Sequence, residues 1–168
     1  MKIAKALKLK NRLAGEISRL KGIVQAKNVR EATQKEVYDV KRIATVDLIN
    51  VIDDLVLVKT VIAMSNAECP SSFIPAGTPF FAIFMMAEIK GYIETLRTVD
   101  TKDGTFNSAQ GRFGEIATSV PTTYVASLKQ VEIDSMIAGF EKKIDDLQDR
   151  LDAHNATAEW ACLDGISV

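Results

Sequence analysis

Apolar residues recur every three or four positions over four long stretches of the chain, which is the period of amphipathic α-helices. This periodicity predicts helices at about 2–26, 36–66, 79–99 and 124–160. In the first helix a narrow apolar stripe is made by Ala6, Leu9, Leu13, Ile17, Leu20 and Val24. The second helix has apolar residues on several sides, from Val37 onward. We therefore expect it to be central, with neighbours on more than one face.

The last predicted helix spaces its apolar residues at alternating steps of four and three, as a coiled coil does. This seam consists of Ile133, Ile137, Phe140, Ile144, Leu147, Leu151, His154 and Ala158. Helices of such length would expose their stripes in a compact monomer. We therefore expect the first and last helices to pair as a coiled coil, within or between subunits, in a homo-oligomer.

Three segments interrupt the helical pattern. Prolines and a glycine separate the second and third helices, and Thr78 followed by Pro79 is a helix-start signal. Before the last helix, Asp103-Gly104 predicts a turn that can open a short strand or hairpin. The polar residues 27–36 indicate another turn. The prediction is an all-α, elongated bundle of about four helices in one domain, 1–168, with one irregular loop or short β element before the last helix.

Composition and charge narrow the possible partners. Hydrophobic residues make up 47% of the chain and charged residues 26%, as in a folded globular protein. The net charge of −1 provides no basic field for nucleic acid, and no aromatic residues lie between the basic residues of the first helix. That helix also lacks an aromatic membrane anchor, and the most apolar run is broken by Pro75, Gly77 and Pro79. We predict neither a nucleic-acid nor a membrane partner.

The N-terminal segment and the cysteines indicate the cellular compartment in which the protein works. The first residues lack the apolar region and cleavage site of a signal peptide. Cys69 and Cys162 are isolated and have no metal-binding spacing around them, which fits a reducing environment. We expect a cytoplasmic protein.

Candidate catalytic groups are few. His154 is the only histidine, and no second ligand accompanies it at metal-binding spacing. The acid pairs Asp53-Asp54 and Asp145-Asp146 are adjacent helical residues, which point about 100° apart and suit a solvated surface. No phosphate loop, dinucleotide fingerprint or nucleophile elbow is present. We predict no cofactor and no metal, and a metal-dependent hydrolase is the third hypothesis for function.

The stretch FNSAQGRFGEIATSVPTT and its surroundings are the leading candidate site. Arginine and lysine side chains bind phosphate, aromatic rings stack on bases, and amides and hydroxyls bind polar edges. The residues offering this chemistry are Arg112, Arg97, Lys102, Phe113, Phe106, Asn107, Gln110, Tyr124 and Thr122. The structural alternative is that Arg112 pairs with an acid while Phe106 and Phe113 fill the core.

The segments RFGEIATSVPT and IDDLQDRLDAHNATAEW resemble the closing part of a small bacterial helical family that carries the name septicolysin. The matching positions are Arg112, Glu115, Ile116, Pro121, Thr122, Ile144, Leu147, Leu151, Asn155 and Trp160. The opening KIAKALKLKNRLAGEISRLK is also similar to the first helix of that family. Four residues lie between Asn155 and Trp160, a departure from the family pattern. The resemblance implies a fold, and it brings no established activity or catalytic residues.

A second resemblance is one of build only. The chain is similar in outline to short, mostly helical, oligomeric phage proteins that sequester nucleotide immune signals without turning them over. The leading hypothesis is therefore a non-enzymatic binding protein for a small anionic, nucleotide-like ligand. A helical scaffold or adaptor that binds partner proteins is the alternative.

Overall fold

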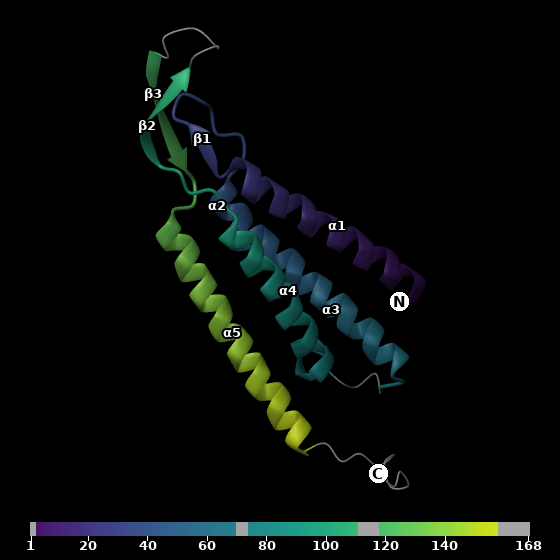
Figure 1. Ribbon diagram of the computed structural model, residues 1–168. Helices are drawn as coiled ribbons and strands as arrows, with labels where there is room; N and C mark the ends of the chain where they lie inside the picture. The colour runs from purple at the N-terminus through teal and green to yellow at the C-terminus, as the bar shows by residue number, and fades with distance from the viewer. Residues whose placement is uncertain (1–2, 70–73, 111–117, 158–168) are drawn as a thin grey trace.

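The computed structural model describes residues 3–69, 74–110 and 118–157, with only the backbone at 108–110 and 118–120. Four long helices run side by side, and a small sheet lies at one end of them (Figure 1). The elements are α1 (Ile3–Lys27), β1 (Val29–Glu31), α2 (Val40–Arg42), α3 (Leu48–Asn66), α4 (Pro79–Arg97), β2 (Gly104–Gln110), β3 (Thr118–Ala126) and α5 (Gln130–Thr157). The chain is mostly helical.

The helices pack in the order α1, α3, α4, α5, so that α1 and α5 lie at opposite sides of the array (Figure 1). The central position predicted for the second helix is confirmed, because α3 contacts α1 on one side and α4 on the other. The pairing of first and last helices within one chain is wrong, since α5 packs on α4 instead. The apolar surfaces of α3 and α4 separate the outer helices.

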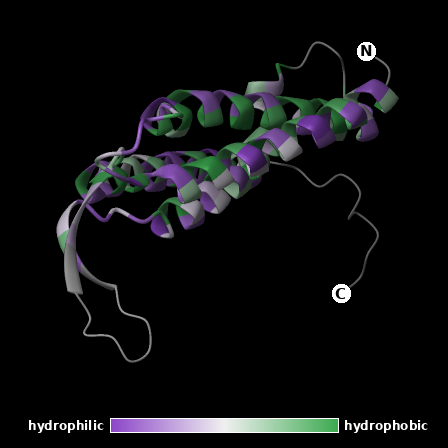
Figure 2. Cartoon of the chain, turned by 90° about the horizontal axis from the view of Figure 1, so that it is seen from above, coloured by the Kyte–Doolittle hydropathy of each residue, from purple (hydrophilic) through white to green (hydrophobic). Residues whose placement is uncertain are grey.

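The apolar stripes of the outer helices face this shared core. Ile17, Leu20 and Val24 of α1 are buried, as are Ile133 and Leu147 of α5. The other apolar seam residues of α5 within the described part, such as Phe140, are partly buried against the same cluster. Hydrophobic and hydrophilic residues alternate along the helices (Figure 2). No helix in the described ranges is long and apolar enough to span a membrane.

The second helix begins later than the predicted residue 36. Asp39 accepts a hydrogen bond from the backbone N–H of Arg42 at 2.9 Å and caps α2. The preceding residues therefore stay outside the helix, and Val37, predicted to lie in the apolar stripe, is 80% exposed. The third helix begins as predicted, with Thr78 as its cap and Pro79 at its first position.

A π-helical turn, Ile43–Asp47, connects α2 to α3. There the N–H of Leu48 donates to the carbonyl of Ile43 rather than to that of Ala44. The Ala44 carbonyl accepts a buried hydrogen bond from the Tyr92 hydroxyl at 2.7 Å. The ring of Tyr92 also lies 5.4 Å from that of Phe140 on α5. This tyrosine therefore connects three helical elements.

The sheet is the main departure from the predicted all-α fold. Its strand order is β1-β3-β2, and both pairings are antiparallel. The last helix begins at Gln130 rather than 124, because Thr118–Ala126 forms β3. The short β element predicted after Asp103-Gly104 is present as the β2–β3 pair, but residues 29–31 were predicted as turn. The sheet extends beyond the ends of the helices (Figure 1).

Asn28 joins the sheet to the helices. Its side chain is fully buried and its amide nitrogen donates to the carbonyls of Asp100 at 2.8 Å and Leu128 at 2.9 Å. Its amide oxygen accepts from the Leu128 N–H at 2.8 Å, and its own carbonyl accepts from the Ser127 N–H at 2.9 Å. One residue after α1 thus holds the connection from α4 to β2 and the connection from β3 to α5.

Substitution Asn28→Ala tests this junction. It leaves two carbonyls and one N–H without their side-chain partner, at a cost of about 1–3 kcal/mol for each buried group that water cannot reach. We expect the free energy of unfolding, measured by urea titration, to fall by at least about 2 kcal/mol. The matched control is Gln25→Ala, which removes an exposed hydrogen bond to Thr98 one turn earlier. Equal effects of the two substitutions would contradict the role of Asn28.

Tyr92 supplies a pH-dependent test of the core. Burial raises the pKa of Tyr92 well above its ordinary value of 10, so the folded state holds the proton more tightly than the unfolded state does. This contribution to stability is complete below pH 10 and decreases as the pH rises above it. Unfolding titrations from pH 7 to 11 should show a smaller alkaline loss in Tyr92→Phe than in the unsubstituted protein. At pH 7, Tyr92→Phe should cost about 1 kcal/mol through the lost bond to Ala44.

Candidate functional site

The β2–β3 pair brings several predicted site residues onto one face of the sheet. Phe106 lies opposite Thr122, and Gly104 lies opposite Tyr124. Directly opposed residues point to the same face, and residues two apart along a strand do so as well. Phe106, Thr122 and Tyr124 therefore share a face. The rings of Phe106 and Tyr124 are diagonal neighbours, with centroids 6.2 Å apart and planes tilted by 59°.

Lys102 completes this group from the segment before β2. Its ammonium nitrogen lies 3.9 Å from the Tyr124 ring centroid and 4.6 Å from that of Phe106. Both distances are within the roughly 6 Å at which a cation is attracted by the negative face of an aromatic ring. Lys102, Phe106 and Tyr124, here named the hairpin cluster, are three residues that the sequence pointed to and that the fold brings together.

The position of Lys102 is fixed through its backbone. Its N–H donates to the Asp100 carboxylate at 2.9 Å, and the Asp100 carbonyl is held by Asn28. The strand then starts at Gly104, whose φ of +110° is rarely adopted by residues with a side chain. Lys129 also pairs with Asp103 at 3.4 Å. Three contacts thus hold the turn before β2: Asn28 with Asp100, Lys102 with Asp100, and Lys129 with Asp103. In this turn the Lys102 side chain lies over the rings of the two strands.

The hairpin cluster is open to solvent. Phe106 is 41% exposed, while Lys102 and Tyr124 are half-buried. Glu31 of β1 lies opposite Tyr124 in the register and therefore on the same face of the sheet. An approaching ligand thus meets an ammonium group, an accessible ring surface and one nearby carboxylate. These groups suit a ligand that carries both an anionic part and a planar part with N–H groups.

The other predicted residues lie elsewhere or outside the described part. Arg97 hydrogen-bonds to Glu94 at 2.7 Å and to Glu141 of α5 at 3.2 Å. Asn107 is exposed and, by strand alternation, lies on the sheet face opposite Phe106. The backbone of Gln110 pairs with Thr118 at the far end of the hairpin. Arg112 and Phe113 fall outside the described residues, so their role stays a prediction.

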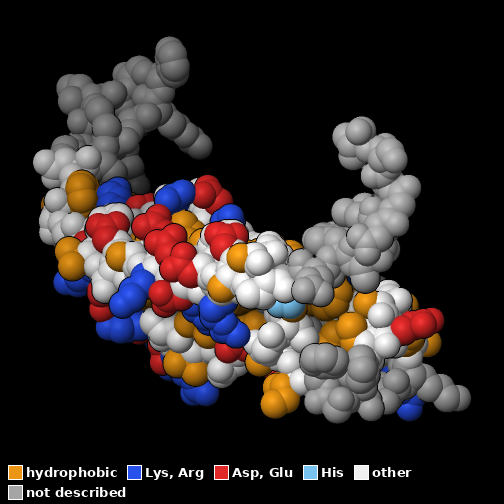
Figure 3. Space-filling model, turned by 90° about the horizontal axis from the view of Figure 1, so that it is seen from below, with side chains coloured by type: hydrophobic (Ala, Val, Ile, Leu, Met, Phe, Trp, Pro, Cys, Tyr) orange, Lys and Arg blue, Asp and Glu red, His pale blue; other side chains and the backbone are white. Residues whose placement is uncertain are grey.

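The groups considered for catalysis do not meet at one site. Asp53 and Asp54 of α3 and Asp146 of α5 line a cavity of about 520 Å³, where Lys143 and Arg150 offset part of their negative charge. In the described ranges, no group of three or more His, Cys, Asp or Glu side chains is placed to hold a metal ion. Figure 3 shows acidic and basic side chains intermixed over one face of the helices. His154 is exposed near the end of α5.

Sequence reasoning missed two features that form the site. Strand β1, Val29–Glu31, follows α1 after a single residue. A segment of three residues carries too little periodicity to identify a strand. The pairing of Phe106 with Tyr124 depends on the register of β2 and β3. The only local signal was Gly104, which marks the start of the hairpin.

No protein-family model matches the chain, and the comparisons with curated proteins and with solved structures gave no match either. The resemblances described from the sequence therefore stay predictions.

The hairpin cluster can be tested without a ligand. Ring currents from two aromatic faces should shift the ε-methylene protons of Lys102 upfield in the NMR spectrum. We expect Tyr124→Leu to reduce this shift more than Phe106→Leu, because the tyrosine ring is closer. Lys41 is the reference, since its ammonium group pairs with Glu132. Lys102 resonances that coincide with those of Lys41 would rule out the cluster.

Proposed function

We propose that the protein is a non-enzymatic binding protein that sequesters a small anionic, nucleotide-like ligand at the hairpin cluster. The observation that supports the proposal is the position of the Lys102 ammonium group, 3.9 Å and 4.6 Å from the centroids of two aromatic rings. Among the predicted residues whose side chains are described, Lys102, Phe106 and Tyr124 meet in space, and Thr122 lies on the same sheet face. A phage-type sponge for a signalling nucleotide is the particular form of this function that the build of the chain suggests.

The chemistry of the cluster suits the two parts of a nucleotide. An ammonium group carries three N–H donors and binds phosphate as a point charge. The exposed surface of Phe106 offers a stacking face for a base, an interaction of about 1–3 kcal/mol. Glu31, on the same sheet face, offers an acceptor for N–H groups of the base. Arg112 and Phe113 follow in the loop between the strands and extend the proposed ligand set.

Binding without turnover follows from the groups at this face. The described residues of the cluster are a lysine and two aromatic residues, and no nucleophile with an adjacent base is among them. Such a set can hold an anion but supplies no activated nucleophile. We also propose that the protein acts as a homo-oligomer. Exposed apolar side chains along the helices, including Leu57 and Val61, support this self-association.

The same exposed side chains support the alternative function, a helical adaptor. Leu57 and Val61 lie one turn apart on α3 and are 44% and 41% exposed. Ile83 on α4 is 47% exposed. Because these residues are regularly spaced along their helices, the apolar face of a partner helix could pack on them. In this alternative the hairpin cluster would stabilise the sheet and bind nothing.

Ligand binding can be measured with a panel of mononucleotides, cyclic dinucleotides and ADP-ribose-type nucleotides. A true ligand at one hundred times its Kd should stabilise the folded protein by about 2.7 kcal/mol and raise its Tm. We expect Phe106→Ala to weaken binding about tenfold through lost stacking, and Lys102→Gln to weaken it through lost charge. The control Lys90→Gln removes an exposed charge of α4 outside the cluster.

The fate of the bound molecule separates the hypotheses. Ligand recovered intact after denaturation supports sequestration, whereas altered ligand indicates an enzyme. If no nucleotide of the panel raises the Tm, while Leu57→Lys abolishes binding of a partner protein, the adaptor is the better description. Light scattering on the same preparation measures the mass, and a monomer would contradict the proposed oligomer.

A further inference from the structure

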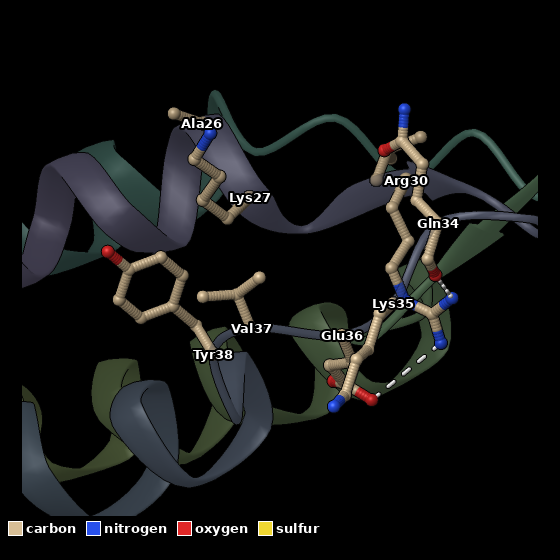
Figure 4. Close-up of a pocket in the computed structure, with 9 residues that line it drawn as sticks. Ala26, Lys27, Arg30, Gln34, Lys35, Glu36, Val37 and Tyr38 are labelled. Atoms are coloured by element: carbon tan, nitrogen blue, oxygen red, sulfur yellow. Dashed lines mark hydrogen bonds and ion pairs between the residues drawn. The ribbon is translucent and has the colours of Figure 1, made fainter.

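A second cavity lies where α1 passes into β1, separate from the residues of the hairpin cluster. It has a volume of about 400 Å³, which is within the range of small-molecule pockets. The end of α1, strand β1 and the segment before α2 enclose it (Figure 4). The side chains that matter here are Lys27, Arg30, Lys35, Glu36, Val37 and Tyr38. All of them belong to the described part of the chain.

Cations dominate the lining of this cavity. The lining includes three cations, Lys27, Arg30 and Lys35, and one carboxylate, that of Glu36, which gives a net charge of +2. Glu36 is engaged with Arg30, whose Nη2 lies 3.7 Å from its Oε2. Neither Lys27 nor Lys35 forms an ion pair with any residue in the described ranges. Two ammonium groups beside the cavity therefore lack a compensating charge from this part of the protein.

Arg30 gives an independent indication of a missing partner. Its Nη1 donates to the Gln34 carbonyl at 2.9 Å, which fixes the guanidinium group in the wall of the cavity (Figure 4). Its Nε is buried and has no hydrogen-bond partner among the described residues. Buried N–H groups are nearly always bonded, because an unmade bond costs about 1–3 kcal/mol. Because this Nε is buried, a ligand oxygen bonds to it only after the side chains around it shift.

One side of the cavity carries two apolar side chains, with Lys27 beside them (Figure 4). Val37 is 80% exposed and Tyr38 is 39% exposed, although both are large and hydrophobic. Figure 4 shows both on one side of the cavity, with Arg30 and Lys35 on the other. The cavity thus combines a cationic wall with an exposed ring and an aliphatic side chain. This combination suits a ligand with a charged end and an apolar or planar body.

We propose that this cavity is a binding site for a phosphate monoester carried on a planar or apolar group. A phosphate monoester has a charge of about −1.5 to −2 at pH 7, which matches the +2 of the lining, whereas a carboxylate compensates only half of it. The phosphate lies against Arg30 and Lys35, and Lys27 adds its positive charge from the side of the cavity that holds Val37 and Tyr38. The body of the ligand packs against Val37 and Tyr38. This site is additional to the hairpin cluster and does not depend on it.

Isothermal titration of the full chain at low salt tests the site, with phenyl phosphate, inorganic phosphate and benzoate as probes. We expect phenyl phosphate to bind most tightly, inorganic phosphate less tightly and benzoate least. The double substitution Lys27→Gln with Lys35→Gln should weaken phenyl phosphate binding about tenfold, because both side chains are exposed and neither pairs with a described acid. Lys90→Gln with Lys142→Gln is the matched control for the lost charge.

Two further variants identify where the probe binds. Tyr38→Ala should reduce the affinity for phenyl phosphate to that for inorganic phosphate, since the contact with the ring is lost. Lys102→Gln, which alters the hairpin cluster, should leave phenyl phosphate binding in place. The proposal is wrong if the double substitution behaves like its control, or if benzoate binds as tightly as phenyl phosphate. Circular dichroism of each variant checks that it is folded.

Discussion

The structure depends on the hydrogen bonds of one buried amide. The side chain of Asn28 joins Asp100 and Leu128, residues 72 and 100 positions further along the chain, and water has no access to it. The amide is well suited to this position because it offers two donors and an acceptor in one plane, and its nitrogen and oxygen are both used. A hydrophobic residue could fill the space but would leave the three backbone groups unbonded. Of the hydrogen bonds that this residue makes at the junction, the one from the Ser127 N–H to its backbone carbonyl would remain.

The same junction places the candidate sites. The backbone carbonyl of Asp100 accepts a hydrogen bond from the Asn28 amide, and the Asp100 carboxylate accepts one from the N–H of Lys102. Lys102 in turn lies over the rings of the β2–β3 pair. On either side of Asn28 in sequence, Lys27 and Arg30 line the cationic cavity. Two sites with different lining residues therefore share one anchoring residue, and both lie at the sheet end rather than along the helices.

The helices were predictable because each long apolar stripe repeats its signal over several turns. Thr78 and Pro79 gave the start of α4 correctly, since cap and proline act locally. The apolar seam residues of α5 from Ile133 to Leu151 were also correct, but their partner is α4 and not α1, and His154, predicted as part of the seam, is exposed. An apolar stripe indicates that a helix is covered and does not indicate by which helix. Asp39 could have indicated the true start of α2, but the apolar Val37 extended the pattern beyond the cap. The sheet was harder to predict because its stabilising contacts are distant in sequence. Val29 pairs with Ala126, and neither segment alternates strongly enough to identify a strand without its partner. Phe106 and Tyr124 were selected from the sequence for their chemistry, while their meeting with Lys102 depends on strand register. Lys27, Arg30 and Lys35 were passed over as parts of a polar turn, because single cations in a turn are usually solvated.

Ion pairs account for only part of the cations in the described residues. On the helices, Lys59 pairs with Glu88 and Arg97 with Glu141, whereas Lys90 and Lys142 form no ion pair with described residues. At the sheet end, Arg30 pairs with Glu36 and Lys129 with Asp103, whereas Lys102 lies against two rings and Lys27 and Lys35 form no ion pair with described residues. The net charge of −1 does not reveal such local groups of cations, because it averages over the whole chain. Salt bridges that hold helices together use their cations internally, whereas cations without acidic partners remain available to bind an anion from solution. In the proposed function, the helical array is the scaffold, and the cations and rings of the sheet end bind the ligand.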